Sequence, residues 1–462
     1  MSKSIWLVKT ILTILILSSL IVCSRSSANS NQKHPLIMDW TTPDIGDLSN
    51  LSIPHLRNRQ YGSKFVKRSA MGNNSSGYSS FMLSYESDEL TNYARIDIPH
   101  QPAPAEGYPV LFYSHGWVGI DNAPLFNFFL EQKGSQAKYI DNMAKQGYVV
   151  ITPGWRGHGT VNGVPAQGIE FMQRWDNASY VSPIFYAIDM LNALDSLESL
   201  ALIEFRQEPL KVNMNKVVLS GHSQGGDSAL VMLAIAGEQS SVKNTIASAS
   251  IFSGCFLPRL VQGGFYGAMA ASPEAFMSGD GTWTKTAAGK NGEINPNFQF
   301  PYPPDWINTV DPDTWSWQKD VWSISTVELA FINKYNQMYE ILHTNKLTTS
   351  NYTLMTDTSG KVSVEHPTDI KDAYFKMDAI NYPQFLSEPL TLHYSDRDYY
   401  SPPFWNKKLA YSLTSINSKV ALFEYEGNTH SLTISPHKWF SQDYNQQGIN
   451  KVITHDLKWF SQ

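Results

Sequence analysis

Cysteine is nearly absent from this chain of 462 residues, which contains only Cys23 and Cys255. Cys23 lies in an apolar N-terminal stretch that is interpreted below as an export signal, so the mature chain would keep Cys255 alone. One cysteine cannot form an internal disulfide, and it excludes a metal site built from several thiolates. A single cysteine after an apolar strand is usually a small core residue, and we expect this of Cys255.

Charged residues are also few, at 16% of the sequence, and the formal net charge is −6. No basic cluster accompanies this balance, so nucleic acid is not an expected partner. The sequence holds no His-Glu-x-x-His motif and no acidic loop with calcium spacing, so we expect neither a metal nor another cofactor. With 42% hydrophobic residues, the chain has the material for a large core instead.

The longest apolar run lies near the N-terminus, within the uncharged stretch 10–24, and Lys3 and Lys9 precede it. This stretch is shorter than the roughly 20 residues that a helix needs to span a bilayer. A small-x-small cleavage pattern follows, so we predict an export signal at 1–28 and a secreted or periplasmic protein without a membrane span in the mature chain. An uncleaved membrane anchor and a lipid-modified Cys23 are the alternatives.

Eight short apolar runs predict β-strands, at 80–86, 93–98, 108–114, 148–152, 216–220, 246–253, 389–394 and 419–425. Helical spacing of apolar residues predicts helices between them, at 124–146, 182–202 and 225–236. Strands that alternate with helices form a mostly parallel sheet with helices on both faces. The first two strands have no helix between them, so we expect them to form an antiparallel pair at the edge.

Residues 256–385 interrupt this alternation, because no crossover between two strands needs that length. We interpret the segment as an inserted cap, with its clearest helix at 327–342. The insertion divides the α/β core into a first part at 79–255 and a second part at 386–462. A polar, loop-like arm at 29–78 precedes the core.

The motif with the most functional information is Gly-His-Ser-Gln-Gly at 221–225. It follows the apolar run 217–219 and precedes a predicted helix, which is the setting of a nucleophile elbow. The two glycines allow the sharp turn that leaves Ser223 at its tip, with the helix N-terminus behind the hydroxyl. We therefore predict that Ser223 is a catalytic nucleophile.

A serine hydroxyl needs a base, and the base needs an orienting acid. In this architecture the acid follows the serine in the sequence, and the histidine follows the acid. The strand at 389–394 leads to two aspartates, of which we favour Asp398, at the turn before the next helix. The other, Asp396, is placed to brace the turn. His430 follows the next strand and is the predicted base, with His437 as the alternative.

Acyl transfer also needs hydrogen-bond donors for the oxyanion. The backbone N–H of Gln224, directly after the nucleophile, is one predicted donor, and that of Trp117 in the loop after the third strand is the other. The Trp117 side chain could also be part of the core. We expect His115 to brace this loop, and we expect neither His222, inside the elbow, nor His393, within its strand, to be the base.

These segments together resemble the α/β-hydrolase superfamily. The chain is most similar to the branch that joins prolyl oligopeptidase-like and dienelactone hydrolase-like catalytic domains and bacterial acyl esterases. The resemblance is carried by residues 108–116, 146–150, 155–159 and 221–226 and by the Asp398 and His430 loops. It implies an α/β-hydrolase fold with a mostly parallel eight-stranded sheet, and a structural role for the loop 156–159. Residues 256–385 match no cap that we can identify.

The first functional hypothesis is hydrolysis of a small-molecule carboxylic ester through an acyl-enzyme intermediate. The same residues can cleave amides, so a prolyl oligopeptidase-like peptidase with a peptide-like substrate is the second hypothesis. A non-catalytic binding protein on this fold is the third, although such proteins usually lose a member of the triad. A carboxylate pair near the elbow would favour an aminopeptidase, and an apolar slot would favour an esterase.

Overall fold

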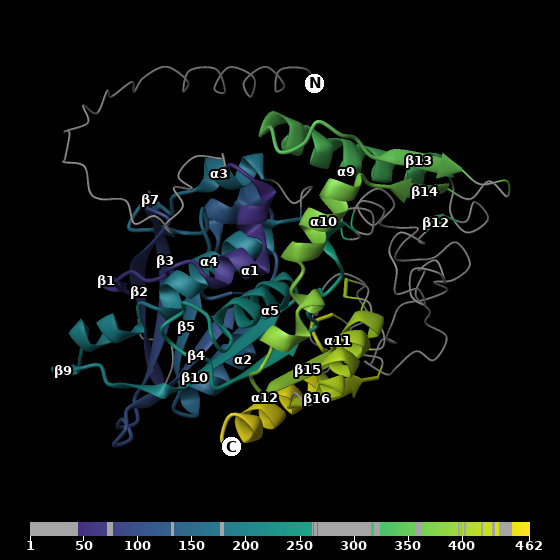
Figure 1. The fold of residues 1–462 in the computed structure, drawn as a ribbon. Coiled ribbons are helices and arrows are strands. Elements are labelled where there is room, and N and C mark those ends of the chain that lie inside the picture. Colours follow the sequence, from purple (N-terminus) through teal and green to yellow (C-terminus); the bar gives the residue numbers. More distant parts are fainter. Residues whose placement is uncertain are drawn as a thin grey trace, which may run out of the picture. The chain divides into compact units, whose positions relative to one another are not determined.

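A nine-stranded sheet organises the structure (Figure 1). In order across the sheet, its strands are β1 (Val66–Ala70), β2 (Tyr78–Ser87), β3 (Leu90–Pro99), β5 (Val149–Pro153), β4 (Tyr108–Ser114), β10 (Val212–His222), β11 (Ser248–Phe252), β15 (Leu390–Ser395) and β16 (Val420–Tyr425). The strands from β5 to β16 are parallel, and β1, β2 and β3 form an antiparallel edge. The predicted α/β-hydrolase class and mostly parallel sheet are confirmed, but the sheet has one strand more than the eight predicted.

The structure is a computed structural model that describes residues 45–71, 77–130, 134–175, 180–260, 262, 266, 316–317, 324–356, 358, 362–395, 398, 400–401, 403–416, 419–426, 430–433 and 446–462. All of them belong to one compact unit, Leu36–Gln462. The predicted export signal at 1–28 and the alternative site residues Asp396 and His437 lie outside the described residues.

The central strands of the sheet are buried on both faces, which explains their almost continuous apolar runs. Along β4, Val110 and Phe112 belong to one hydrophobic core, and Leu111 and Tyr113 belong to a second. The side chains of a strand alternate between its faces, so the two cores lie on opposite sides of the sheet. The first core contains α1 (Ile53–Arg57), α4 (Ser182–Leu194), α5 (Gln224–Ala236) and α11 (Pro403–Ser415), and the second contains α2 (Ser135–Lys145) and α12 (Gln447–Trp459).

Two of the predicted helices are shorter than expected. The helix predicted at 124–146 begins only at Ser135, after a short 3-10 helix at Ile120–Leu125, because Phe126 and Phe128 turn into a separate apolar cluster. The helix predicted at 182–202 ends at Leu194, where the Asp195 carboxylate accepts the backbone N–H groups of Lys243 and Asn244. A 3-10 helix at Leu197–Leu202 follows. Both ends depend on contacts with distant residues, which local periodicity does not contain.

The N-terminal arm is more ordered than predicted. Instead of a loop, its described part forms a 3-10 helix at Leu48–Leu51, the helix α1 and the edge strand β1. Leu48, Leu51, Ile53 and Leu56 are buried in the first core. The ninth strand of the sheet, β1, therefore comes from this arm. It was not predicted because residues 29–78 are polar on average, although a few apolar residues among them are buried.

The insertion between β11 and β15 has a small fold of its own. Its described elements are α9 (Ile324–Thr344), a three-stranded antiparallel sheet of β12 (Ser316–Trp317), β14 (Val362–Glu365) and β13 (Thr353–Thr356), the helix α10 (Thr368–Met377), and two short 3-10 helices. The predicted helix at 327–342 lies within α9, and its residues Tyr335, Met338 and Leu342 are buried as their spacing predicts. Figure 1 draws α9, α10, β13 and β14 in shades of green.

The remaining described elements are short. They are α3 (Ile169–Arg174) and two two-stranded hairpins, β6 (Thr160–Val161) with β7 (Val164–Pro165), and β8 (Glu204–Phe205) with β9 (Glu208–Pro209).

Candidate active site

Four chemically distinctive residues follow four neighbouring strands of the sheet. Ser223 follows β10, Cys255 follows β11, Asp398 follows β15, and His430 follows β16. Because these strands are parallel neighbours, their C-terminal ends share one edge of the sheet, which is where open α/β sheets bind ligands. The topology therefore brings residues more than 200 positions apart to one edge.

Ser223 occupies a sharp turn between β10 and α5. Its backbone has φ 59° and ψ −126°, which is an uncommon conformation for a residue with a side chain. Such strain persists only where the surroundings impose it, and it is concentrated at functional sites. The residue is mostly buried, with 8% of its surface exposed.

The glycines on either side of Ser223 are there because no side chain fits. A Cβ on Gly221 would lie 2.5 Å from the carbonyl oxygen of Gly225. A Cβ on Gly225 would overlap the backbone carbonyls of Ser114 and His115 at the end of β4. The spacing of the motif thus reflects two close backbone approaches around the serine.

His430 is held by Asp398. The imidazole Nδ1 lies 2.8 Å from each carboxylate oxygen of Asp398. Asp398 is fully buried, and its Oδ1 also accepts the backbone N–H groups of Tyr400 and Ser401, each at 2.9 Å. These contacts fix the carboxylate, and the carboxylate fixes the ring. The other ring nitrogen, His430 Nε2, is buried and has no hydrogen-bond partner among the described residues.

His222, the residue before Ser223, connects the serine turn to the loop that carries His430. His222 Nε2 lies 3.1 Å from the backbone oxygen of His430, and the two imidazole rings are 4.9 Å apart. Burial, together with the neighbouring His430, lowers the pKa of His222 to about 3, so its ring is neutral and donates this hydrogen bond. His222 therefore ties the His430 loop to the serine turn, which agrees with the expectation that it is not the base.

The Ser223 hydroxyl contacts Cys255, with Oγ and Sγ 3.9 Å apart. Among the described residues no hydrogen bond joins Ser223 Oγ to His430 Nε2. Hydrogen bonds of this kind are often long in unliganded enzymes and shorten when substrate binds. The structure thus pairs His430 with Asp398 and ties the His430 loop to the serine turn, while the Ser223 hydroxyl contacts the Cys255 thiol.

Cys255 is the site neighbour that the sequence analysis missed. It is buried, as expected of a small core residue, and burial raises the pKa of its thiol to about 12. Its position in the sequence could have predicted this contact, because Cys255 lies three residues after the end of β11, the strand beside β10. Parallel neighbours end at the same edge, so a residue just beyond β11 is expected to lie close to one just beyond β10.

The loop after β4 passes beside Ser223. A Cβ on Gly116 would lie 3.6 Å from the Ser223 Cβ and 3.1 Å from His222 Nδ1. The Gly116 N–H donates to Gln136 Oε1 at 2.9 Å, so this N–H group is not free to bind an oxyanion. The next residue is Trp117, whose side chain is 61% exposed, so the alternative that this tryptophan belongs to the core is wrong.

His115 braces this loop rather than facing the site. Its Nδ1 lies 2.8 Å from the Gly116 backbone oxygen, and its ring stacks on Trp155 and Phe126 at 3.8 and 4.1 Å. Burial and the nearby His158 lower the pKa of His115 well below its ordinary value, so the ring stays neutral. The stack thus holds the start of this loop against Trp155, which follows β5.

Two further groups that the sequence singled out are structural. Arg156 is fully buried and forms ion pairs with Asp189 at 2.7 Å and Asp88 at 2.9 Å. His393 lies within β15, with Nε2 2.9 Å from an oxygen of Asp456 and Nδ1 2.8 Å from the Tyr425 hydroxyl. Both nitrogens of His393 are occupied, so it has no free position for a base.

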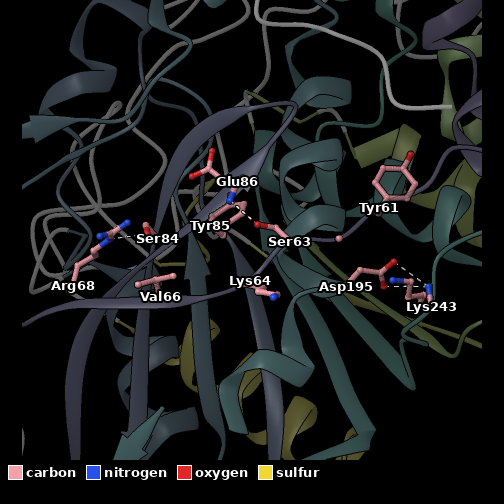
Figure 2. A pocket seen from close by; sticks show the side chains of 11 residues that line it. Tyr61, Ser63, Lys64, Val66, Arg68, Ser84, Tyr85, Glu86, Asp195 and Lys243 are labelled. Atoms are coloured by element: carbon pink, nitrogen blue, oxygen red, sulfur yellow. Dashed lines mark hydrogen bonds between the residues drawn. The ribbon is translucent and has the colours of Figure 1, made fainter. Parts of the chain in front are cut away.

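A pocket in the described part of the chain lies away from the candidate triad residues. It has a volume of about 490 Å³ and is lined by residues 61–64, 66 and 68, by residues 84–86 of β2, and by Asp195 and Lys243 (Figure 2). None of Ser223, Asp398 and His430 lines it. Several of its polar groups bind one another, as in the hydrogen bond from Arg68 Nε to Ser84 Oγ at 2.7 Å.

Within the described part of the chain, no group of three His, Cys, Asp or Glu side chains is arranged to hold a metal ion. The helices described there include none with the length and apolar character needed to cross a membrane.

Several solved structures are similar to this chain at low identity. A putative dipeptidyl aminopeptidase IV from Bacteroides ovatus is 12% identical over 84% of this chain and 36% of its own, with a TM-score of 0.46. Pyrococcus horikoshii acylaminoacyl peptidase is 14% identical over 84% of this chain and 42% of its own, with a TM-score of 0.44. Acetyl xylan esterase 1 from Thermoanaerobacterium sp. is 12% identical over 90% of this chain and 93% of its own, with a TM-score of 0.46.

No protein-family model matches the sequence, and no curated protein matches it either. This chain spans less than half the length of the two peptidases. Identities of 12% to 14% concern the fold alone, so we draw the function from the residues of this chain.

Proposed function

We propose that this protein is a secreted serine hydrolase that cleaves a carboxylic ester through an acyl-enzyme intermediate. The observation that carries the proposal is the orientation of His430. Its Nδ1 is held by Asp398, and its Nε2 is buried without a partner beside the strained serine turn. An imidazole held in this way presents its second ring nitrogen to the site, as a general base must.

In the proposed reaction, Ser223 Oγ attacks the ester carbonyl carbon while its proton passes to His430 Nε2. Asp398 keeps the imidazole in the required tautomer and stabilises the imidazolium. The tetrahedral oxyanion receives the backbone N–H groups of Gln224 and Trp117, and its collapse expels the alcohol with the proton from His430. Water then attacks the acyl-enzyme by the same route, releasing the carboxylic acid and restoring Ser223.

An ester is favoured over a peptide with a free amino terminus by the carboxylates around the first turn of α5. Asp227 and Asp378 are both buried there, and both are engaged by Arg259. A carboxylate already paired with a guanidinium is a poor partner for a substrate ammonium group. In the described part of the chain, the carboxylate pair that lies near the serine is therefore structural.

The test is a panel of p-nitrophenyl esters and aminoacyl anilides on the wild type and on Ser223→Ala. We expect ester turnover in the wild type and its loss in the variant. If anilides were turned over faster than esters, the proposed substrate would be an amide and not an ester. A folded wild type that turns over neither would favour a binding protein.

The proposed secretion rests on the N-terminal sequence and is tested separately. We expect protein recovered from the periplasm or the culture medium to begin at residue 29. A membrane-bound protein with an intact N-terminus, or with a lipid on Cys23, would contradict a cleaved signal.

A further inference from the structure

Arg259, four residues after Cys255, lies in a buried polar cluster at the start of the insertion, with 1% of its surface exposed. Its two terminal nitrogens donate to the two carboxylate oxygens of Asp227, at 3.1 and 3.0 Å, and one of them also donates to the backbone oxygen of Tyr180 at 3.0 Å. A guanidinium bound at two points to a carboxylate has its orientation fixed as well as its distance.

Asp227 belongs to the first turn of α5, directly after the serine turn. Its backbone N–H donates to the carbonyl oxygen of Ser223 at 3.2 Å, and the N–H groups of Gly226 and Cys255 reach the same oxygen at 2.9 and 3.3 Å. These bonds restrain a residue whose positive φ needs support from its surroundings. A displacement of the Asp227 side chain would therefore also shift the backbone turn that positions the Ser223 hydroxyl.

The same arginine also binds the far end of the insertion. Its backbone N–H lies 3.1 and 3.3 Å from the two carboxylate oxygens of Asp378, and its Nε lies 3.6 Å from one of them. Gln262 adds a bond from its Nε2 to Asp227 at 3.2 Å. The beginning and the end of the inserted segment thus meet at the first turn of α5.

We propose that Arg259 is a positioning residue, which fixes the turn that carries Ser223 and makes its geometry depend on the inserted segment. The inference rests on the proposed role of Ser223 as nucleophile. Loss of the guanidinium would leave Asp227 and Asp378 as neighbouring buried carboxylates without their shared cation, which strongly disfavours the native arrangement. The first turn of α5 would then loosen while the rest of the helix stays packed in the core.

The other end of α5 provides a matched control. Arg57 is 8% exposed and donates from Nη1 to the carbonyl oxygens of Ala234 and Ile235, at 2.7 and 3.5 Å. Arg57→Met, a substitution in α1, therefore removes a buried cation that binds the C-terminal end of α5 and leaves the first turn of α5 untouched. A general loss of helix stability would affect Arg57→Met and Arg259→Met alike, whereas a positioning role would separate them.

The experiment compares Arg259→Met, Arg259→Lys and Arg57→Met. It measures the melting temperature, kcat and KM for a p-nitrophenyl ester, and hydrogen exchange of the Gly226 and Asp227 amides. We expect both Met variants to melt at lower temperature. Only Arg259→Met should lose kcat by at least about tenfold with little change in KM, and only there should the two amides exchange at least about tenfold faster. Arg259→Lys, which keeps the charge but not the two-point contact, should fall between.

A folded Arg259→Met that keeps both its kcat and its amide protection would overturn the inference, and so would equal effects in Arg57→Met. If Arg259→Met does not fold, Arg259→Lys and Asp378→Asn provide the same comparison with Arg57→Met. Failure of the proposed function is distinguishable, because a wild type without turnover refutes the reaction while the amide exchange still reports on the turn.

Discussion

His430 Nδ1 lies 2.8 Å from both carboxylate oxygens of Asp398, and its Nε2 has no partner among the described residues. A second buried pair, His393 with Asp456, has nearly the same spacing at 2.9 Å, but the other nitrogen of His393 is bound to Tyr425. The difference that matters for catalysis is that only the His430 pair leaves a ring nitrogen without a partner among the described residues. This contrast separates a catalytic arrangement from a structural one within a single molecule.

The two pairs predict opposite outcomes for one substitution. Asp398→Asn should lower kcat/KM by about 10⁴-fold with little loss of stability, because it favours the wrong tautomer of His430. Asp456→Asn should lower the free energy of unfolding by roughly 1–3 kcal/mol, because it disrupts a buried hydrogen-bond network, and should leave kcat nearly unchanged. Steady-state kinetics and urea unfolding of both variants check this. A similar loss of activity in both would contradict the assignment.

Trp117 allows its backbone N–H to be tested apart from its side chain. The side chain is 61% exposed, so Trp117→Ala should leave kcat within a few-fold of the wild type. Trp117→Pro removes the N–H and should lower kcat by about 10²–10³-fold if that group binds the oxyanion. Melting temperatures would show whether both variants are folded. Equal activity of folded Ala and Pro variants would remove Trp117 from the proposed oxyanion site.

Cys255 should be unreactive despite its contact with Ser223. Burial raises the pKa of the thiol to about 12, so less than about 0.1% is thiolate at pH 8. We expect no modification of the folded protein by iodoacetamide over an hour, and complete modification in urea, followed on the Cys255 peptide by mass spectrometry. Modification within minutes at pH 8 without urea would show that the thiol is accessible and ionised.

The sequence was most informative where chemistry and local geometry coincide. All eight predicted strands are present, and the apolar runs of β4, β5, β11 and β15 are buried on both faces of the sheet. The serine motif lies between β10 and α5 as predicted, because the two glycines meet backbone atoms at Gly225 and His115. Asp398 and His430 were predicted as partners because each follows a predicted strand downstream of the serine, and the structure places their side chains 2.8 Å apart.

Features that depend on distant partners were missed. The ion pair of Arg259 with Asp227 and the contact of Arg259 with Asp378 join positions that only the folded insertion brings together. The helix end at Leu194 depends on the amides of Lys243 and Asn244, which bind Asp195. No periodicity within a window of the sequence contains these contacts.

Asp378 should give the protein a distinctive pH dependence. Burial is the main cause that raises the pKa of Asp378, and together with Asp227 it brings this pKa to about 7 despite the lowering effects of Arg259 and Lys408. Tyr374 also lies in this cluster, and it stays neutral across this range because burial raises its pKa. Between pH 4 and 7 the folded chain therefore keeps a proton that the unfolded chain has released.

This contribution to stability is complete below about pH 4 and is lost as the pH rises through 7, with a slope of at most about 1.4 kcal/mol per pH unit. Asp378→Asn should remove it. The check is urea unfolding of the wild type and the variant from pH 4.5 to 8, where the other titrating groups cancel in the difference. A difference that is flat with pH would show that Asp378 is ionised throughout.

The most direct measurement of the central claim is to map the adduct of a serine-directed fluorophosphonate by peptide mass spectrometry. The account predicts one adduct, on Ser223, that is absent from Ser223→Ala and forms far more slowly in His430→Ala. A folded wild type that stays unlabelled, or an adduct on another residue with Ser223 unmodified, would contradict it.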